Sequence, residues 1–254
     1  MPRYTYKDWY PWSPGDVARK ENVLLAARLM MNAALTSPVT GGMPQVEGEL
    51  VYGEEEQEQL ARKMEELAYG TPTSPNWRHL FLYEAVMARE ADAILLIGNT
   101  RAHRTPWDGD CGACGGSGCS YVYERRAQVR GVIDPTDRRR DVMVKGPFCA
   151  LYAHNTGYAV GSALMAAVRL YVDARPFMSM GIAAQKLGYC ANSEIVVAVA
   201  AAARQKHEFR DPGTDYHLVN MASGVDALRK QVSQSGLRPA SGLDYRAFDP
   251  GKLQ

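Results

Sequence analysis

The sequence predicts an α/β protein in which a central sheet of few strands is covered by helices, with a glycine- and cysteine-rich loop after a central strand. Residues 93–98 form the continuous apolar run Ala-Ile-Leu-Leu-Ile-Gly, which is typical of a strand covered on both faces. Residues 17–34 and 54–69 instead place apolar residues at the 3.6-residue spacing of amphipathic helices. The composition, with 46% hydrophobic and 22% charged residues, is ordinary for a globular protein with ample core.

The first half of the chain is expected to contain three helices and two strands. Residues 1–15 are rich in aromatic residues and proline, and this arm is expected to pack on its own domain or on a partner subunit. After it we predict a helix from Asp16 to about Leu35, a turn over 36–43, a strand over 45–52, an acidic helix over 54–69, a loop over 70–76, a helix over 77–90 and the strand over 93–98.

The second half is expected to be mainly helical. Residues 121–145 are rich in arginine and contain two candidate short strands, 129–133 and 142–144. A long helix follows over 149–173, in which Gly157 and Gly161 allow close approach of a neighbouring helix or a cofactor. Beyond it we predict a helix over 176–187 that ends at Gly188, a buried strand over 194–200, a helical region over 215–234 and a loop over 235–254.

Three cysteines lie close together after the apolar strand, and a fourth follows at the start of the long helix. They are Cys111, Cys114, Cys119 and Cys149, with the spacing C-x2-C-x4-C-x29-C. Four thiolates complete the outer coordination of a cubane iron–sulfur cluster, one for each iron. We therefore predict that these four residues hold a 4Fe–4S cluster.

Glycines surround these cysteines, and we expect them to form the backbone of the cofactor site. They are Gly112, Gly115, Gly116 and Gly118. Glycine allows positive φ and close approach of the chain, and the free N–H groups of such a loop can point at the sulfur atoms of an anionic cluster. Asp108 and Asp110 flank the loop and are expected to cap its turns.

Other interpretations of the cysteines are weaker. A structural zinc site usually takes two C-x2-C pairs, whereas only Cys111 and Cys114 form such a pair here. A disulfide scaffold is disfavoured by the small number of cysteines and by the absence of a signal-peptide pattern. Cys190 is the spare candidate for the fourth ligand, and its alternative role is that of a small buried hydrophobic residue.

The order of these parts resembles the uncharacterised bacterial and archaeal proteins that contain a ferredoxin domain. The similar segments are residues 21–28, 60–67, 92–98, 110–115, 146–150, 159–163, 172–175 and 179–184. The local string C-G-x-C-G-x-x-x-C is also similar to the 4Fe–4S domain of corrinoid iron–sulfur proteins. The resemblance implies an iron–sulfur protein and does not supply a reaction. Compared with the family pattern, the arginine-rich segment between the third and fourth cysteines looks like an insertion.

The predicted organisation is one domain with two appendages. The aromatic arm occupies residues 1–15, a single α/β domain occupies 16–205 and carries the iron–sulfur loop at 101–149, and a C-terminal helix and tail occupy 206–254.

The predicted function is one-electron transfer, as a redox subunit or small oxidoreductase that works with a redox partner protein. Residues 101–145 contain nine Lys or Arg and six Asp or Glu, a balance that could attract an acidic electron donor. One alternative is a flavin-dependent reductase in which the cluster feeds electrons to bound FMN. Another is a non-enzymatic interaction subunit in which a cluster or zinc only stabilises the fold.

Charge and hydropathy disfavour other classes of partner. The net charge of +1 indicates neither nucleic acid nor an anionic membrane surface as a partner. The longest charge-poor apolar run, residues 155–168, is too short to span a bilayer. We expect a cytoplasmic protein with reduced thiols that forms a homo-oligomer.

Overall fold

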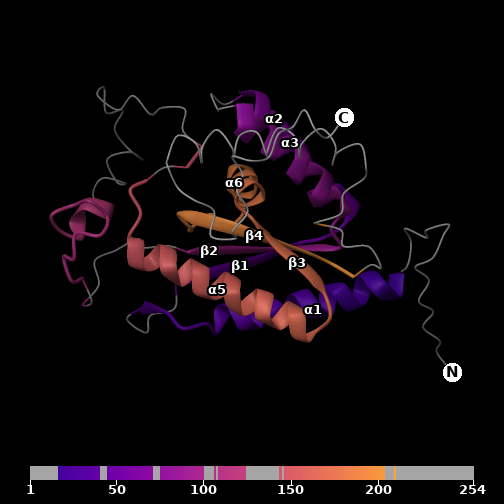
Figure 1. The fold of residues 1–254 in the computed structure, drawn as a ribbon, viewed down its shortest axis with the longest axis horizontal. Helices are drawn as coiled ribbons and strands as arrows, with labels where there is room; N and C mark the ends of the chain where they lie inside the picture. The colour runs from indigo at the N-terminus through magenta and orange to yellow at the C-terminus, as the bar shows by residue number, and fades with distance from the viewer. Residues whose placement is uncertain are drawn as a thin grey trace, which may run out of the picture. The chain divides into compact units, whose positions relative to one another are not determined.

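The computed structural model describes most of residues 17–203 (Figure 1). The described residues are 17–40, 45–70, 75–99, 106, 108–123, 143–144, 146–203 and 209, and all belong to one compact unit of residues 1–210. The aromatic arm, the candidate strand at 129–133 and the helical region predicted at 215–234 lie outside the described residues.

The elements confirm the predicted α/β class. In chain order they are α1 (Val17–Leu35), β1 (Val46–Val51), α2 (Glu54–Gly70), α3 (Pro75–Glu90), β2 (Ala93–Asn99), α5 (Ala150–Arg169), β3 (Asp173–Phe177), α6 (Met178–Leu187) and β4 (Ile195–Ala202). None of the helices in the described part of the chain is long and apolar enough to cross a bilayer.

The sheet has four strands in the order β1-β2-β4-β3, and every neighbouring pair is antiparallel. All seven residues of β2 are buried, so the prediction of a strand covered on both faces is confirmed. Continuous apolar runs are more common in parallel sheets. Here the same burial arises in an antiparallel sheet because helices cover both of its faces.

The side chains of β2 and β4 alternate between two cores. Leu95, Ile97 and Val199 pack with α1 and α5, whereas Ile94, Leu96 and Ala198 pack with α2, α3 and α6. This is the period-2 alternation of a strand applied to a sheet with an apolar layer on each side. Figure 1 shows α1 and α5 on one side of the sheet and α2, α3 and α6 on the other.

Two buried polar contacts join the helices to their neighbours. Arg19 of α1 forms an ion pair with Asp92, which directly precedes β2, and Asp92 Oδ2 also accepts the N–H of Ala203 at 3.3 Å, just past β4. On the other face, Ser179 of α6 donates to the carboxylate of Glu84 on α3. Burial raises the pKa of the Glu84 carboxyl, and the hydroxyl of Ser179 partly opposes this effect.

Two predicted helix boundaries and one predicted strand were wrong. The helix predicted to reach residue 173 ends at Arg169, and the edge strand β3 lies between it and α6, which begins at Met178. β3 is specified by pairing with β4 and tolerates Pro176 because it lies at the sheet edge, so a local helical pattern concealed it. Residues 143–144, predicted within a strand, form a bend.

Gly181 allows α6 to lie directly against β4. A Cβ atom at this position would stand 2.0 Å from the carbonyl oxygen of Val196, which is backbone and cannot rotate away. We expect Gly181→Ala to lower the free energy of unfolding by about 1–3 kcal/mol through overpacking. Urea unfolding measures the change. Gly70→Ala is the control because a Cβ there meets nothing within 4 Å, and equal loss of stability in both variants would contradict the packing.

Candidate metal centre

The cysteine loop is closed by hydrogen bonds between its two ends. The N–H of Cys119 donates to Asp110 Oδ1 at 2.7 Å, and the hydroxyl of Tyr123 donates to Asp108 Oδ2 at 3.1 Å. The first bond joins residues 9 positions apart and the second joins residues 15 positions apart, and Cys111 and Cys114 lie in the segment that both enclose. The two aspartates therefore join the loop ends, in agreement with the turn-capping role expected for them.

The loop backbone takes conformations that favour glycine. Gly112 and Gly115 have φ of 72° and 85°, and Asp110 has φ of 43°. The N–H of Gly115 donates to the carbonyl of Gly112 at 2.9 Å, which closes a tight turn that directly follows Cys111 and contains Cys114. Since L side chains rarely adopt these φ values, a side chain at 112 or 115 would strain the loop.

The other two glycines differ from each other. A Cβ at Gly116 would lie 2.4 Å from the Tyr121 side chain, so glycine there permits a close contact within the loop. At Gly118 the nearest atom is Asp110 Oδ1 at 3.3 Å, a contact that a small shift would relieve. The structural requirement for glycine is thus strongest at the first three of the four predicted positions.

Cys149 occupies the N-cap position of α5. Its φ of −71° and ψ of 123° are extended, and its side chain makes no capping hydrogen bond. Its carbonyl oxygen accepts the N–H groups of Tyr152 and Ala153 at 3.1 and 3.0 Å, so the helix begins immediately after it. The N-terminus of a 20-residue helix carries partial positive charge, which favours a thiolate or an anionic group beside it.

The end of β2 is attached to this same helix terminus. Asn99 Nδ2 donates to the carbonyl of Tyr152 at 3.1 Å, and Gln45 Nε2 donates to the Tyr152 hydroxyl at 2.7 Å. The strand that leads into the cysteine loop therefore meets the helix that begins at Cys149. No motif in the sequence marks Asn99, Gln45 or Tyr152 as part of a site. The available signal was that Asn99 is a polar residue directly after an apolar run.

The structure does not bring the four predicted ligands together as a ligand set. Cys111 is exposed, Cys114 is half-buried, and Cys119 and Cys149 are buried. Within the described part of the chain, no three His, Cys, Asp or Glu side chains are grouped so that they could hold a metal ion. The assignment of the four cysteines to one cluster therefore stays a prediction.

Cys190 has surroundings that disfavour a metal ligand. It is fully buried, and its thiol lies 3.9 Å from the carbonyl oxygen of Leu96 on β2. Burial, with smaller contributions from Glu49 and Glu47, raises the pKa of this thiol to about 12. A thiol with that pKa stays protonated at neutral pH, which fits the alternative role of a small buried hydrophobic residue.

Comparison with known proteins identifies the family. A family of uncharacterized proteins containing a ferredoxin domain matches residues 145–212, a range that includes Cys149. An uncharacterized protein of Archaeoglobus fulgidus is 34% identical over 193 residues, which make up 76% of this chain and 93% of that protein. The chain belongs to the ferredoxin-domain family. The resemblance inferred from the sequence segments is thereby confirmed.

Solved structures with a similar arrangement are distant from this ferredoxin-domain protein. They include the NADPH:FMN oxidoreductase of Vibrio harveyi (13% identity, TM-score 0.40, 72% of this chain and 60% of that one), nitroreductase A of Vibrio parahaemolyticus (14%, 0.41, 72% and 59%) and a nitroreductase family protein of Clostridium novyi (6%, 0.40, 71% and 74%). The chain thus spans about 60% of the length of the two Vibrio proteins.

The loop closure predicts a measurable effect at Asp110. Replacing it by alanine removes the acceptor of the Cys119 N–H and also places a less tolerant residue at a φ of 43°. We expect the Cys119 amide to exchange its hydrogen about tenfold faster, as loss of one such bond implies. Hydrogen-exchange mass spectrometry of residues 108–123 measures this. Asp110→Asn keeps an acceptor and tolerates the backbone, so equal acceleration in both variants would contradict the assigned role.

Proposed function

We propose that this chain is an iron–sulfur protein that transfers single electrons, with Cys111, Cys114, Cys119 and Cys149 holding a 4Fe–4S cluster. The observation that carries the proposal is the closed loop in which Cys111 and Cys114 lie beside residues of positive φ and the N–H of Cys119 bonds back to Asp110. Membership of the ferredoxin-domain family supports it, and the family match includes the fourth cysteine.

The donor type and the loop backbone suit such a group, while the four thiols are not yet gathered into one set in the structure. Four thiols match the four irons of a cubane cluster, and the positive φ values at Gly112 and Gly115 turn the chain tightly around the first two cysteines. Successive backbone N–H groups in turns of this kind create a local preference for anions. A cluster ligated by thiolates carries negative charge, so the loop and the bound group are electrostatically compatible.

The position of Cys149 supports its choice over Cys190. Both are buried, but Cys149 begins a 20-residue helix, and the N-terminus of a helix carries partial positive charge that suits an anionic group. Cys190 lies close to two carboxylates and has a raised pKa. Of the two cysteines, Cys190 is therefore the less suitable ligand, and Cys149 has the helix N-terminus beside it.

Binding of the cluster would also assemble its ligands. Since metal binding is coupled to folding, part of the binding free energy goes into ordering the segments that supply the thiolates. In this site those segments are the loop around Cys111–Cys119 and the start of α5. Asn99 and Gln45 hold the start of α5 against the sheet through Tyr152. The cysteine loop is therefore the segment that would have to move to gather the four thiolates.

A bound 4Fe–4S cluster with four thiolate ligands supplies one-electron transfer, since no iron is left open to substrate. The chain's own residues then exclude water at Cys119 and Cys149 and leave Cys111 at the surface. A cluster exposed on the side of Cys111 could exchange electrons with a redox partner protein. FMN, the alternative cofactor, would convert the same electron transfer into reductase chemistry.

The proposal is tested by purification without oxygen and analysis of the metal. We expect a brown protein with about four iron and four sulfide per chain, as the cluster requires. Cys149→Ala should lose most of the iron and sulfide, whereas Cys190→Ala should keep both. This matched pair removes a buried thiol in each case, so a general effect of cavity formation appears in both variants.

Two results would overturn the proposal. One is a colourless protein that contains zinc without sulfide. The other is a Cys149→Ala variant that keeps the iron content of the wild type. An acid extract of the same preparation is examined for flavin fluorescence, and one flavin per chain would favour the reductase over a simple electron carrier.

A further inference from the structure

The outward face of α5 repeats along the helix at alternating spacings of three and four residues. The residues are Leu151, His154, Tyr158, Gly161, Met165 and Val168, here called the α5 seam, and all six are exposed. The opposite face, with Ala159, Ala163 and Ala167, is buried against the sheet. Alternating spacings of three and four are the a and d positions of a heptad, the pattern of a helix that packs on another helix.

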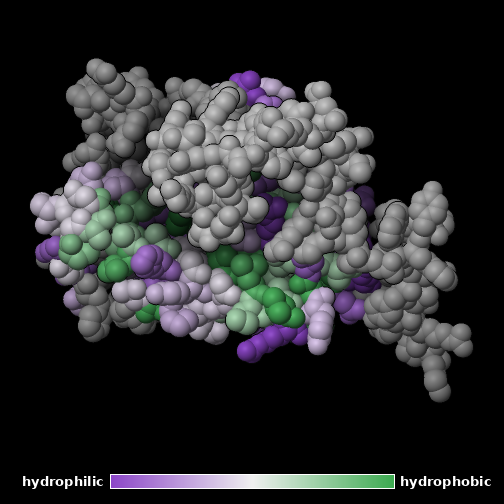
Figure 2. Space-filling view, viewed as in Figure 1, coloured by the Kyte–Doolittle hydropathy of each residue, from purple (hydrophilic) through white to green (hydrophobic). Residues whose placement is uncertain are grey.

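No described element covers the seam. Tyr158, Met165 and Val168 are 52%, 58% and 72% exposed, although α1 packs beside α5 in the same layer. In Figure 2 the surface over α5 shows green patches among pale purple and some stronger purple atoms. Several large apolar side chains exposed on one helix face indicate an interaction site more than a solvated face, which is normally polar.

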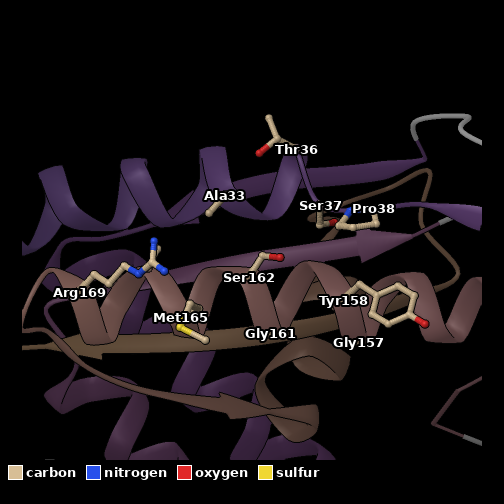
Figure 3. A pocket seen from close by; sticks show the side chains of 11 residues that line it. Ala33, Thr36, Ser37, Pro38, Gly157, Tyr158, Gly161, Ser162, Met165 and Arg169 are labelled. Atoms are coloured by element: carbon tan, nitrogen blue, oxygen red, sulfur yellow. The ribbon is translucent and has the colours of Figure 1, made fainter.

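A hollow accompanies the protruding side chains. A cavity of about 590 Å³ lies between α1 and α5, and Gly157 and Gly161 line it where an added Cβ would meet nothing within 4 Å. Figure 3 shows the two helices running in opposite directions, with Tyr158 and Met165 on either side of Gly161. One surface therefore carries both a hollow and the bulky side chains that could fill it.

The charge of the seam favours a second copy over another partner. The 20 residues of α5 contain no Asp, Glu or Lys, and Arg169 is the last of them. A surface that meets its own copy across a two-fold axis juxtaposes like charges wherever it carries a net charge. An uncharged seam avoids this repulsion, whereas it offers nothing to an acidic or basic partner.

We propose that the α5 seam binds the α5 seam of a second copy of this chain, antiparallel and about a two-fold axis. An axis between Tyr158 and Gly161 places each tyrosine of one copy opposite the glycine of the other. The same axis sets Leu151 opposite Val168, and His154 opposite Met165. Large residues then meet small ones at the centre and apolar residues meet at the ends, as an isologous interface requires.

The exposed apolar side chains supply much of the surface that such a dimer would bury. The exposed large side chains of the seam and of the neighbouring α1 face are Leu25, Leu29, Leu151, Tyr158, Met165 and Val168, each 41–72% exposed. Together they present on the order of 600 Å² of apolar surface, close to the roughly 800 Å² that each partner buries in a standard interface.

The proposal is tested on the full chain by sedimentation at several concentrations. We expect the wild type to have about twice the 28.0 kDa chain mass. Leu151→Lys and Val168→Glu should each weaken dimerisation at least tenfold, because each places a charge against an apolar side chain. The double variant should recover the dimer, because antiparallel packing sets the new opposite charges against each other.

The matched control is Tyr69→Asp, which introduces a charge at a 68% exposed aromatic position on α2, away from the seam, and should leave the dimer intact. Far-ultraviolet circular dichroism confirms that each variant is folded. A wild type that is monomeric at all concentrations would overturn the proposal. So would single variants that dimerise like the wild type, and a double variant that stays monomeric would exclude the antiparallel arrangement.

Discussion

Burial of β2 and β4 on both faces is the constraint on which the other elements depend. Their side chains alternate between two apolar layers, and each layer is completed by helices on its own side of the sheet. Neither strand is stable in this form without both layers, because half of its apolar side chains would lie in water. The buried pair of Arg19 and Asp92 then joins α1, the start of β2 and the end of β4 on one side of this arrangement. Removal of either partner would leave a charge buried without its counterpart, which is strongly destabilising.

The end of the same strand contacts the helix that begins at Cys149. β2 ends at Asn99, whose side chain holds the first turn of α5, and the chain then enters the cysteine loop. Cys149 begins α5 at that terminus. The cysteine loop follows β2 in the chain, and Cys149 begins the helix that the end of β2 contacts. Cys190 lies elsewhere, with its N–H bonded to Glu49, and burial together with the charges of Glu49 and Glu47 raises the pKa of its thiol.

Much of this arrangement could be predicted from the sequence because its signals are local. The apolar run of β2, the amphipathic pattern of α2 and the glycine at the end of α6 each specify their element within a few residues. β3 could not be predicted in this way, since its strand conformation depends on pairing with β4 about 25 residues later. Strand direction was equally inaccessible, because two-sided burial produces the same apolar run in parallel and antiparallel sheets. The contacts of Asn99 and Gln45 with Tyr152 required the tertiary arrangement as well.

Helix α5 contributes to three features of the molecule. Its inner alanines pack on the sheet, its N-terminus carries Cys149, and its outer seam is uncovered by any described element. The cluster assignment is examined most sharply by diffraction from crystals of the full chain grown without oxygen, with data collected on both sides of the iron absorption edge. We predict iron-specific density in contact with the sulfur atoms of Cys111, Cys114, Cys119 and Cys149. Density with the absorption edge of zinc, or iron bound without the sulfur of Cys149, would contradict the assignment.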